Sequence, residues 1–563
     1  MRRGIYSPLF VILTTVLVAA CTNMVSCHGL NPPPAQWLAY RNNPGRFGAQ
    51  FLSSALSNPT NVLATLHVGW KSPGANWTGP SMPGPFKASP IVFNNTVFIG
   101  DINGVFWALN AADGSFKWRY PASGSGLNGS CAAGYPGQFW GSYGIESSAT
   151  YASIGNNVDA VIFGAPDPDH GTDNGNGSAR LWALNSTTGA LIWKSDVVAN
   201  VPNCTGRIHE RIAYSSPLVA FGRVYVGVHD AGDDPVQKGR LVAVDVNTGH
   251  AITSGYPFIV DGAPGDLSCG GVCGGGIWDS PALIGDGIVF TTGNVCDTNM
   301  PGSQCQTAPS PDNSLSMLSV DPTSGALKWS FRAVPFELDS DPDWSAGPTA
   351  MITSCGEISA SVQKNGWTYA IDPSNGSCKW QYPPTSGPMC KFSPTATIDQ
   401  GDDDYKQPGA SWGDYLFIQT GGEMLTNLGN FGSGYGQIQA LDACQKNSSD
   451  RVRWIAPISP GAPYSIGAPT VTNGIVFVTT SAGHVIALAD PSVAPAVGFT
   501  CSNTNFSLAD CSTAGFSIVP VPASKDVVLD DGGDAVGLRM EAAIALDKLF
   551  VATDQGHVYA LWP

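Results

Sequence analysis

One pattern of apolar and polar positions recurs along almost the whole chain. A short apolar run beside a Gly precedes a second run of the type Ala-Leu-Asn or Ala-Val-Asp, then a turn ending in Gly and a short segment often closed by Trp. Short apolar runs bounded by turn residues predict the strands of small antiparallel sheets. Eight copies of the second run lie at residues 107–110, 182–185, 242–245, 318–321, 369–372, 439–442, 486–488 and 558–561.

A sheet of this size cannot bury both of its faces alone. Sheets that are arranged radially bury each other and leave only short, protected edges. The repeats therefore predict an all-β fold, an eight-bladed β-propeller of four-stranded antiparallel sheets. The last copy has no closing Trp segment, so we expect the unpaired apolar run at 63–70, which ends in Trp70, to complete the eighth sheet and close the ring. An irregular stack of β-hairpins is the alternative.

Composition agrees with many short strands and excludes two classes of protein. Only 12% of the residues are charged, and there are 67 Gly and 43 Pro. A coiled-coil or long helical protein would carry far more Glu, Lys and Arg. The net charge of -16 argues against nucleic-acid binding, which needs a basic surface.

The N-terminus has the pattern of an export signal. Arg2 and Arg3 precede a largely apolar stretch over residues 9–20, which is too short to span a membrane. We expect a secretion signal over residues 1–29 and a single propeller domain over residues 30–563. Cys21 also fits a lipoprotein cleavage site, so a lipid anchor at Cys21 is the alternative to plain secretion. No later stretch is long and apolar enough to predict a membrane span.

The cysteines favour an oxidising, extracellular compartment. The chain has 14 Cys, and if Cys21 and Cys27 leave with the signal an even number remains, which predicts disulfides. The near-neighbour pairs are Cys269 with Cys273, Cys296 with Cys305 and Cys501 with Cys511, while the pairing among Cys355, Cys378, Cys390 and Cys444 stays open. Sequons that permit N-glycosylation are present at Asn76, Asn94, Asn128, Asn176, Asn185, Asn203, Asn375, Asn447 and Asn505.

The recurring Ala-x-Asp-x-x-(Thr)-Gly-x-x-x-Trp pattern resembles the tryptophan-docking repeat of the quinoprotein alcohol dehydrogenases. The resemblance covers nearly the whole mature chain and is greatest to the polyvinyl alcohol dehydrogenase branch. Three stretches carry it beyond the repeat: 274–281 with Thr-Thr-Gly-Asn at 291–294, Asp-Asn-Ser-Leu at 312–315, and Val-Gln-Lys-Asn-Gly-Trp at 362–367.

The resemblance implies pyrroloquinoline quinone (PQQ) and Ca²⁺ as cofactors. It assigns Asn294 to the Ca²⁺, which prefers oxygen ligands, with Asp230 or Asp233 and the more distant Glu146 as further candidates. It places Lys364 beside the quinone carbonyls, where a cation stabilises negative charge, and the flat indole of Trp278 beneath the ring. One aspartate would take the proton of the alcohol. The candidates for this base are Asp339, Asp341 and Asp343.

Each of these residues also has a structural interpretation. Asn294 could cap a turn, and Lys364 precedes Asn-Gly, a good hairpin turn that would leave the lysine in solvent. Trp278 could pack in the core, and the aspartates could form an ordinary acidic loop. The chain also departs from the family, because it has no adjacent Cys-Cys pair and no glutamate pair in the third blade.

The sequence therefore predicts a secreted PQQ- and calcium-dependent dehydrogenase for an alcohol or sugar-like hydroxyl. The absence of a Cys-x-x-Cys-His motif predicts no haem, so electrons would leave to a separate acceptor. The alternative is a non-catalytic propeller that binds a glycan, polymer or protein. The dehydrogenase hypothesis requires Trp278, Asn294, Lys364 and at least one of the three aspartates to converge at one end of the central channel.

Overall fold

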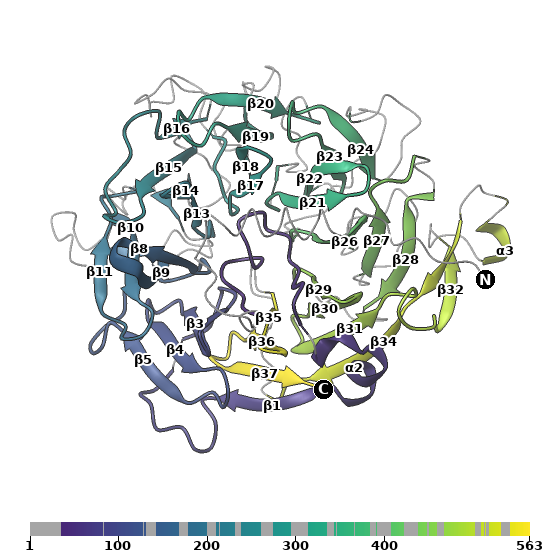
Figure 1. Ribbon diagram of the computed structural model, residues 1–563, viewed down its shortest axis with the longest axis horizontal. Helices are drawn as coiled ribbons and strands as arrows, with labels where there is room; N and C mark the ends of the chain where they lie inside the picture. Colours follow the sequence, from purple (N-terminus) through teal and green to yellow (C-terminus); the bar gives the residue numbers. More distant parts are fainter. Residues whose placement is uncertain are drawn as a thin grey trace, which may run out of the picture.

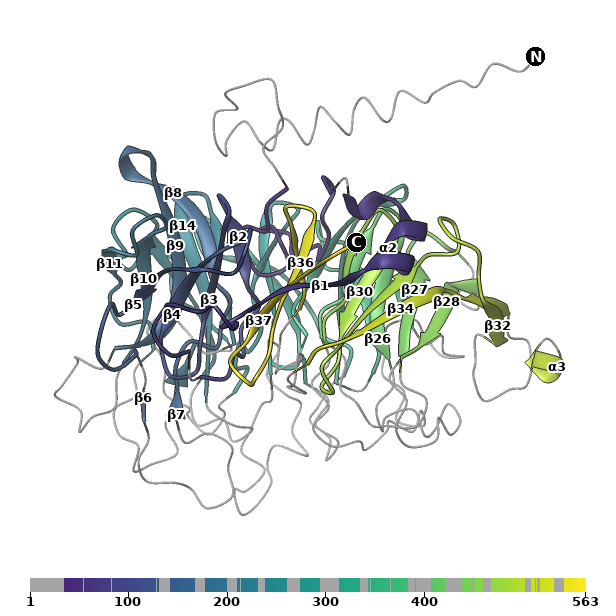
Figure 2. The same cartoon turned by 90° about the horizontal axis from the view of Figure 1, so that it is seen from below.

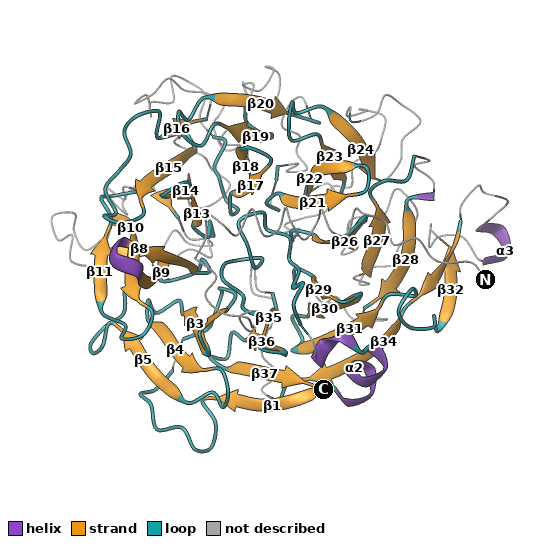
Figure 3. Ribbon diagram, in the orientation of Figure 1, coloured by secondary structure: helices purple, strands orange, loops and turns teal. Residues whose placement is uncertain are grey.

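Eight sheets of short antiparallel strands stand around a central axis in the computed structural model (Figure 1). Seven of the sheets have four strands, and the third contains a fifth, short strand. The prediction of an eight-bladed propeller is confirmed, and Figure 3 shows how little of the chain is helical. The structure describes residues 35–563 except 54, 83, 128, 131–141, 168–177, 200–209, 213, 231–237, 261–273, 294–312, 335–342, 345, 365, 383–389, 391–406, 421–436, 447–449, 459–466, 502–507, 512, 514–516 and 531–540.

The blades follow one another in chain order. Blade 1 contains β2 (Ile91–Phe93), β3 (Thr96–Gly100), β4 (Phe106–Asn110) and β5 (Phe116–Tyr120), and blade 2 contains β8 (Thr150–Ile154), β9 (Val158–Asp167), β10 (Ser178–Asn185) and β11 (Leu191–Lys194). Blade 3 contains β13 (Leu218–Ala220), β14 (Arg223–Asp230), β15 (Arg240–Asp245) and β16 (Phe258–Ile259), with β12 (Glu210–Arg211) beside β14. Blade 4 contains β17 (Ala282–Ile284), β18 (Gly287–Thr291), β19 (Met317–Val320) and β20 (Leu327–Phe331).

The second half of the ring repeats this order. Blade 5 contains β21 (Thr349–Thr353), β22 (Gly356–Val362), β23 (Thr368–Ile371) and β24 (Cys378–Tyr382), and blade 6 contains β25 (Ala410–Trp412), β26 (Tyr415–Thr420), β27 (Gln437–Asp442) and β28 (Val452–Pro457). Blade 7 contains β29 (Thr470–Thr472), β30 (Ile475–Thr479), β31 (His484–Ala489) and β34 (Ala523–Val528). Blade 8 contains β35 (Ala543–Ala545), β36 (Lys548–Ala552), β37 (Val558–Trp562) and β1 (His67–Ser72).

The remaining elements are short. They are η1 (Ala55–Ser57), α2 (Pro59–Thr65), η2 (Gly155–Asn157), α3 (Leu508–Cys511), the strand pair β6 (Gly129–Ser130) and β7 (Ser142–Tyr143), and the hairpin β32 (Gly498–Cys501) with β33 (Ile518–Val521). No helix in the described part of the chain is long and apolar enough to cross a membrane. The secretion signal predicted over residues 1–29 lies outside the described residues.

The strands run between two faces of the disc (Figure 2). In every blade the first strand lies nearest the axis, and the chain reverses after each strand because neighbours are antiparallel. The turns between first and second strands and between third and fourth strands therefore share one face, which we call the turn face. The other connections, including those from blade to blade, share the opposite face, which we call the loop face.

The repeated Trp and Gly join neighbouring blades. Trp118 at the rim of blade 1 donates its indole N–H to the Ser186 carbonyl of blade 2 at 3.3 Å, and a Cβ at Gly189 would lie 2.6 Å from the indole. Gly189 also has a φ of 71°, which L side chains rarely adopt. The turn therefore needs Gly for its conformation and for the close approach of the Trp. In blade 3, where the Trp is absent, the Tyr256 hydroxyl donates instead to the Asp321 carbonyl at 3.1 Å.

The eighth blade combines both ends of the chain. β1 pairs with β37 in antiparallel register, and Trp70 docks on blade 1 through a 3.3 Å hydrogen bond to the Ala111 carbonyl. The predicted start of this strand is wrong, because residues 63–65 belong to α2. Pro59 opens that helix, and the Asn58 side chain caps it by accepting from the Asn61 N–H at 3.2 Å.

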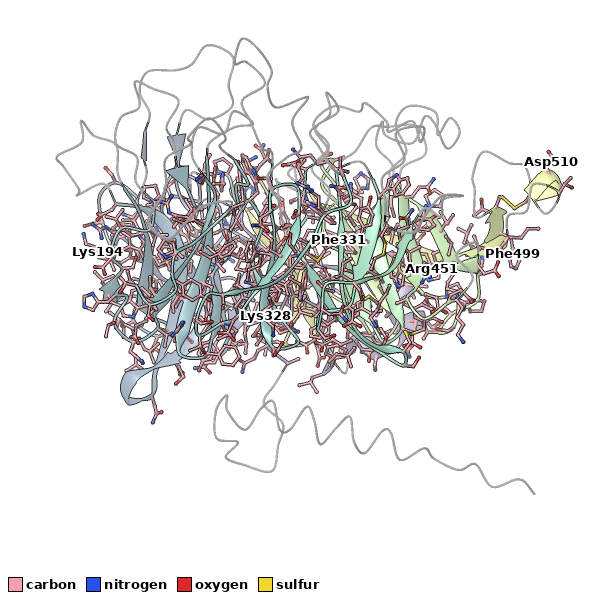
Figure 4. All side chains as sticks on the ribbon, turned by 90° about the horizontal axis from the view of Figure 1, so that it is seen from above. Lys194, Lys328, Phe331, Arg451, Phe499 and Asp510 are labelled. Carbon is pink, nitrogen blue, oxygen red and sulfur yellow. A yellow bond between two sulfur atoms is a disulfide. The ribbon has the colours of Figure 1, made fainter. Side chains whose placement is uncertain are left out.

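Three disulfides are present among the described residues. Cys501 pairs with Cys511 as predicted, on the hairpin that projects from the disc and includes the labelled Phe499 (Figure 4). The pairing that the sequence left open is Cys355 with Cys444, which joins blades 5 and 6, and Cys378 with Cys390. The other two predicted pairs, Cys269 with Cys273 and Cys296 with Cys305, lie outside the described residues.

Candidate functional site

A buried ion pair lies at the loop face of blade 5. The Lys364 Nζ is 2.6 Å from the Asp343 Oδ1, and the two side chains are only 10% and 2% exposed. Asp343 precedes the inner strand β21, while Lys364 follows β22 in the same blade. The Lys364 amide also donates to the Asp343 carbonyl at 3.0 Å, so backbone and side chains hold the two residues together.

The turn after β22 fixes the position of Lys364. The Gln363 amide donates to the Trp367 carbonyl at 2.9 Å, and the Gly366 amide donates back to the Gln363 carbonyl at 2.8 Å. Gly366 has a φ of 79°, which the turn requires. The predicted turn at Gly366 is thus present, but Lys364 beside it is buried and ion-paired instead of solvated.

Gly293 lies between the indole of Trp278 and the carboxylate of Asp343. A Cβ at Gly293 would be 2.6 Å from the Trp278 Nε1 and 3.1 Å from the Asp343 Oδ2. Both groups therefore pack closely against Gly293 at the end of β18. Gly293 is held there because its amide donates to the Gly276 carbonyl at 2.8 Å and its carbonyl accepts from the Leu315 amide at 3.2 Å.

Trp278 belongs to a cluster of three buried rings, in which the Tyr214 ring also lies 6.1 Å from the Trp278 ring. The His229 ring is 4.1 Å from the Trp278 ring with an interplanar angle of 26°, and the Tyr214 ring is 5.6 Å from His229 at 15°. His229 and Tyr214 come from blade 3 and were not predicted as site residues. Their one sequence signal is a polar residue, His229, at the end of the apolar run of β14.

Asp279 links blades 4 and 5 next to the site. Its carboxylate accepts from the Ser280 amide at 2.5 Å and from the Gly347 amide, and so it links the start of blade 4 to the start of blade 5. Trp278 and Asp343 lie just before these two points. Trp344 adds a second link, because its indole N–H donates to the Leu315 carbonyl at 3.0 Å.

The predicted metal ligands are only partly described. Glu146 lies before β8 in blade 2 and is half-buried, and Asp230 is the last residue of β14. Asn294, Asp233, Asp339 and Asp341 lie outside the described residues. Within the described ranges, no group of three or more His, Cys, Asp or Glu side chains is placed to hold a metal ion.

Known proteins share both the sequence pattern and the fold. No family model matches the chain. The polyvinylalcohol dehydrogenase of Sphingopyxis sp. is 24% identical over 53% of this chain and 44% of its own length. The quinoprotein alcohol dehydrogenase PedH of Pseudomonas putida is 23% identical over 67% of this chain and 60% of its own length. The chain thus spans less than two thirds of the length of these relatives.

Solved structures show the same architecture. A quinohemoprotein alcohol dehydrogenase from Pseudomonas putida HK5 superposes with a TM-score of 0.60 over 94% of this chain and 80% of its own, at 15% identity. A europium-containing methanol dehydrogenase gives a TM-score of 0.59 over 94% of this chain and 99% of its own, at 16% identity. These solved structures therefore share the fold of this chain. The predicted resemblance of the sequence to the quinoprotein alcohol dehydrogenases is confirmed by the curated relatives.

Proposed function

We propose that this chain is a secreted, PQQ-dependent dehydrogenase that oxidises an alcohol or sugar-like hydroxyl and passes electrons to a separate acceptor. The observation that carries the proposal is the buried pair of Lys364 and Asp343, whose carboxylate packs with Trp278 against Gly293. Burying two charges has a large desolvation penalty, so such a pair adds little stability by itself. Its position at the loop face of a propeller favours a chemical role.

The described residues fit a planar quinone. Trp278 offers a flat apolar surface and Asp343 a carboxylate beside Gly293, and Lys364 adds a cation paired with Asp343. PQQ, when bound, supplies a quinone that takes up two electrons from the substrate carbon. The chemistry of the donor set therefore agrees with the cofactor that the resemblance implies.

Each residue has a role that follows from its chemistry. Lys364 holds positive charge where negative charge develops during reduction. Asp343 accepts the hydroxyl proton of the substrate, and Lys364 keeps the carboxylate aimed at the site. Trp278 shields one side of the site from water, and the rings of His229 and Tyr214 support the indole. Asp339 and Asp341 are alternative bases in the same connection.

Calcium is a further part of the proposal. Asn294 directly follows Gly293 in the sequence and is the proposed amide-oxygen ligand, although it lies outside the described residues. Asp230 or Asp233 from blade 3 and Glu146 from blade 2 would add carboxylate oxygens, which Ca²⁺ prefers. Removal of Ca²⁺ with a chelator should weaken PQQ binding, and Glu146→Gln should lower the Ca²⁺ affinity if Glu146 is a ligand. Equal PQQ affinity with and without Ca²⁺ would remove the metal from the proposal.

Reconstitution tests the function directly. Purified protein is incubated with PQQ and Ca²⁺, and the oxidation of a panel of alcohols is followed by dye reduction. Asp343→Asn should still bind PQQ but lose about 100-fold or more in turnover, because the base is gone. Lys364→Met should weaken both binding and turnover. The matched control is Lys379→Met, which breaks a Lys–Asp pair of 3.1 Å at the turn face of the same blade and should change neither.

The outcomes separate the two hypotheses for the fold. Wild-type protein that binds no PQQ under any condition contradicts the proposal. Protein that binds PQQ at Lys364 but oxidises no alcohol contradicts the dehydrogenase activity, whereas the non-catalytic alternative, a propeller that has lost the cofactor, predicts no PQQ binding. Disulfides such as Cys355 with Cys444 support secretion, because such bonds persist in oxidising compartments.

A further inference from the structure

A segment of irregular backbone, residues 35–53, runs inside the ring of blades. Figure 1 draws it as the purple trace across the centre. We call this segment the inner belt. It ends at the turn face, where the Ser53 hydroxyl donates to the Asp547 carboxylate at 2.9 Å and the Ser53 carbonyl accepts from the Asn473 side chain at 2.8 Å.

The inner belt forms backbone hydrogen bonds with seven of the eight blades. In most of them an amide of the innermost strand, or of the turn after it, donates to a belt carbonyl. The bonds run from Leu546 to Ala35, Val92 to Trp37, Tyr151 to Leu38, Leu283 to Pro44, Ala350 to Gly45, Ser411 to Phe47 and Val471 to Gly48, at 2.7–2.9 Å. Innermost strands are sheet edges whose amides would otherwise be unpaired. The belt therefore covers the inner edge of blades 8, 1, 2, 4, 5, 6 and 7.

Arg46 completes the circle at blade 3. Its Nη2 donates to the Ser216 and Pro217 carbonyls of blade 3 at 3.1 Å, and its Nε donates to the Pro281 carbonyl of blade 4 at 3.0 Å. The side chain is 1% exposed, and burial lowers the pKa of Arg46 to about 10. The guanidinium thus remains charged at neutral pH, with carbonyl oxygens as its hydrogen-bond acceptors.

Arg41 also donates hydrogen bonds from the belt to carbonyls of neighbouring blades, on the other side of the axis. Its Nη1 donates to the Pro469 carbonyl of blade 7 at 2.8 Å and pairs with Glu541 of blade 8, and its Nη2 donates to the Gly409 carbonyl of blade 6. A Cβ at Gly48 would lie 2.1 Å from the Arg41 Nη2, so the belt needs Gly at this point.

The two arginines point from the belt toward the loop face. Their acceptors at Ser216, Pro281, Gly409 and Pro469 precede the innermost strands, and these strands begin at the loop face. The belt is also tightly packed, because its large side chains are fully or almost fully buried. These side chains are Trp37, Tyr40, Arg41, Arg46 and Gln50.

We propose that the inner belt closes the central channel from the turn face and ties all eight blades together, so that ligands of the site at Asp343 and Lys364 enter and leave only by the loop face. Arg46 also connects the belt to that site, because it lies near Asp279, whose carboxylate joins blades 4 and 5. The closure itself does not depend on the proposed function.

Hydrogen exchange tests the closure. In wild-type protein the amides of Leu283, Ala350, Ser411 and Val471 should be as protected as amides of the second strands. Arg46→Met should speed exchange in blades 3 and 4 by about tenfold or more, and Arg46→Lys should restore part of the protection. The matched control is Arg451→Met, since Arg451 is also buried, donates to carbonyls and has a pKa lowered to about 10, but lies at the rim of blade 6.

A cap on each face tests the single entrance. Leu52 is 60% exposed at the turn-face end of the belt, and Gln555 is exposed in the loop-face connection of blade 8. Leu52→Cys and Gln555→Cys are biotinylated and capped with streptavidin, with labelled wild type as the control for native cysteines. PQQ should associate at the wild-type rate with the Leu52 cap and more slowly with the Gln555 cap.

The results are decisive for the belt in every case. Slower PQQ association with the Leu52 cap, or inner-strand amides that exchange like an exposed sheet edge, would overturn the proposal. If PQQ does not bind at all, the proposed function fails, and the exchange rates still decide whether the channel is closed.

Discussion

At the scale of single residues, Gly293 determines whether the site can form. Its missing side chain leaves room for the Trp278 Nε1 and the Asp343 Oδ2, which a Cβ would meet at 2.6 and 3.1 Å. Gly293→Ala should therefore displace the indole or the carboxylate and weaken PQQ binding by about tenfold or more, since protein interiors relax poorly. Near-UV circular dichroism of the Trp signal and PQQ titration check this.

A matched glycine separates this effect from a general loss of Gly. A Cβ at Gly498 would meet nothing within 4 Å. Gly498→Ala should leave both the Trp signal and the PQQ affinity unchanged. If Gly293→Ala behaves like Gly498→Ala, the packing of Trp278 and Asp343 on Gly293 does not shape the cofactor site.

Asp101 gives the protein a pH-dependent stability term. Burial raises the pKa of Asp101, although hydrogen bonds from Trp107 at 2.9 Å and Val105 at 3.0 Å oppose the shift. A raised folded-state pKa means that the folded protein binds the proton more tightly than the unfolded chain. The contribution of Asp101 to the free energy of unfolding therefore falls as pH rises above the ordinary pKa of an Asp.

Asp101→Asn should remove this dependence. The free energy of unfolding of the variant should be about 1 kcal/mol lower, because one amide oxygen cannot accept from both Trp107 and Val105 as the two carboxylate oxygens do. Its stability relative to wild type should then rise as pH rises through the acid range, as measured by denaturant unfolding at several pH values. A difference between variant and wild type that does not vary with pH would contradict this prediction.

The sequence predicted part of the site. Trp278, Asn294, Lys364 and one of the three aspartates were expected to converge because ends of equivalent strands in consecutive blades share a face. The structure brings Asp343 together with Lys364 and with Trp278, while Asn294 lies outside the described residues. The stacking of His229 and Tyr214 on Trp278 could not be predicted, since contacts between rings of different blades depend on how the blades pack.

At the scale of elements, the turn Gly and the rim Trp form the joint between blades. The Trp329 indole donates to the Pro373 carbonyl at 2.8 Å and packs on Gly376, where a Cβ would lie 2.8 Å from the Trp329 Cβ. Gly376 and Gly222 have similar φ angles of 75° and 71°, but a Cβ at Gly222 meets nothing.

These two glycines allow a matched test of the joint. In both Ala variants the free energy of unfolding should fall by about 1 kcal/mol, because Ala is strained in a left-handed backbone conformation. Gly376→Ala should lose about 1–3 kcal/mol more, because its Cβ displaces the Trp. Equal losses in thermal unfolding would show that the Trp–Gly contact does not stabilise the ring.

The disulfides differ in what they connect. Cys355 and Cys444 are 89 residues apart and join two blades, while Cys501 and Cys511 are 10 residues apart within one hairpin. Cross-links that close longer loops restrict the unfolded chain more. Replacing both Cys355 and Cys444 by Ser should lower the free energy of unfolding by about 2–4 kcal/mol. Replacing Cys501 and Cys511 by Ser should lower it less. The reverse order in denaturant unfolding would contradict the prediction.

The repeat predicted the strands of the blades but not the elements outside it. Apolar runs such as the one that became β3 identify strands because each must pack against two neighbours. The apolar residues at 63–65 fit a strand equally well, and the Asn58 cap with Pro59 makes them helical instead. The inner belt could not be predicted, because its hydrogen bonds come from the innermost strands and its own residues show no regular spacing.

At the scale of the whole molecule, the turn face carries the contacts that join the blades, and the loop face carries the candidate site. The turn face joins the blades through the rim tryptophans, and the inner belt hydrogen-bonds to the innermost strands of seven blades. The loop face holds the buried pair of Lys364 and Asp343 beside Trp278. A ring fixed in this way gives a rigid frame for a site built from residues of several blades.

The most direct test of this account is a crystal structure of the protein grown with PQQ and Ca²⁺. The account predicts the quinone against the indole of Trp278, with its carbonyl oxygens within hydrogen-bond reach of the Lys364 Nζ and with the Asp343 carboxylate facing the position of the substrate. PQQ bound elsewhere, or a Lys364–Asp343 pair that remains closed and untouched with PQQ present in excess, would contradict it.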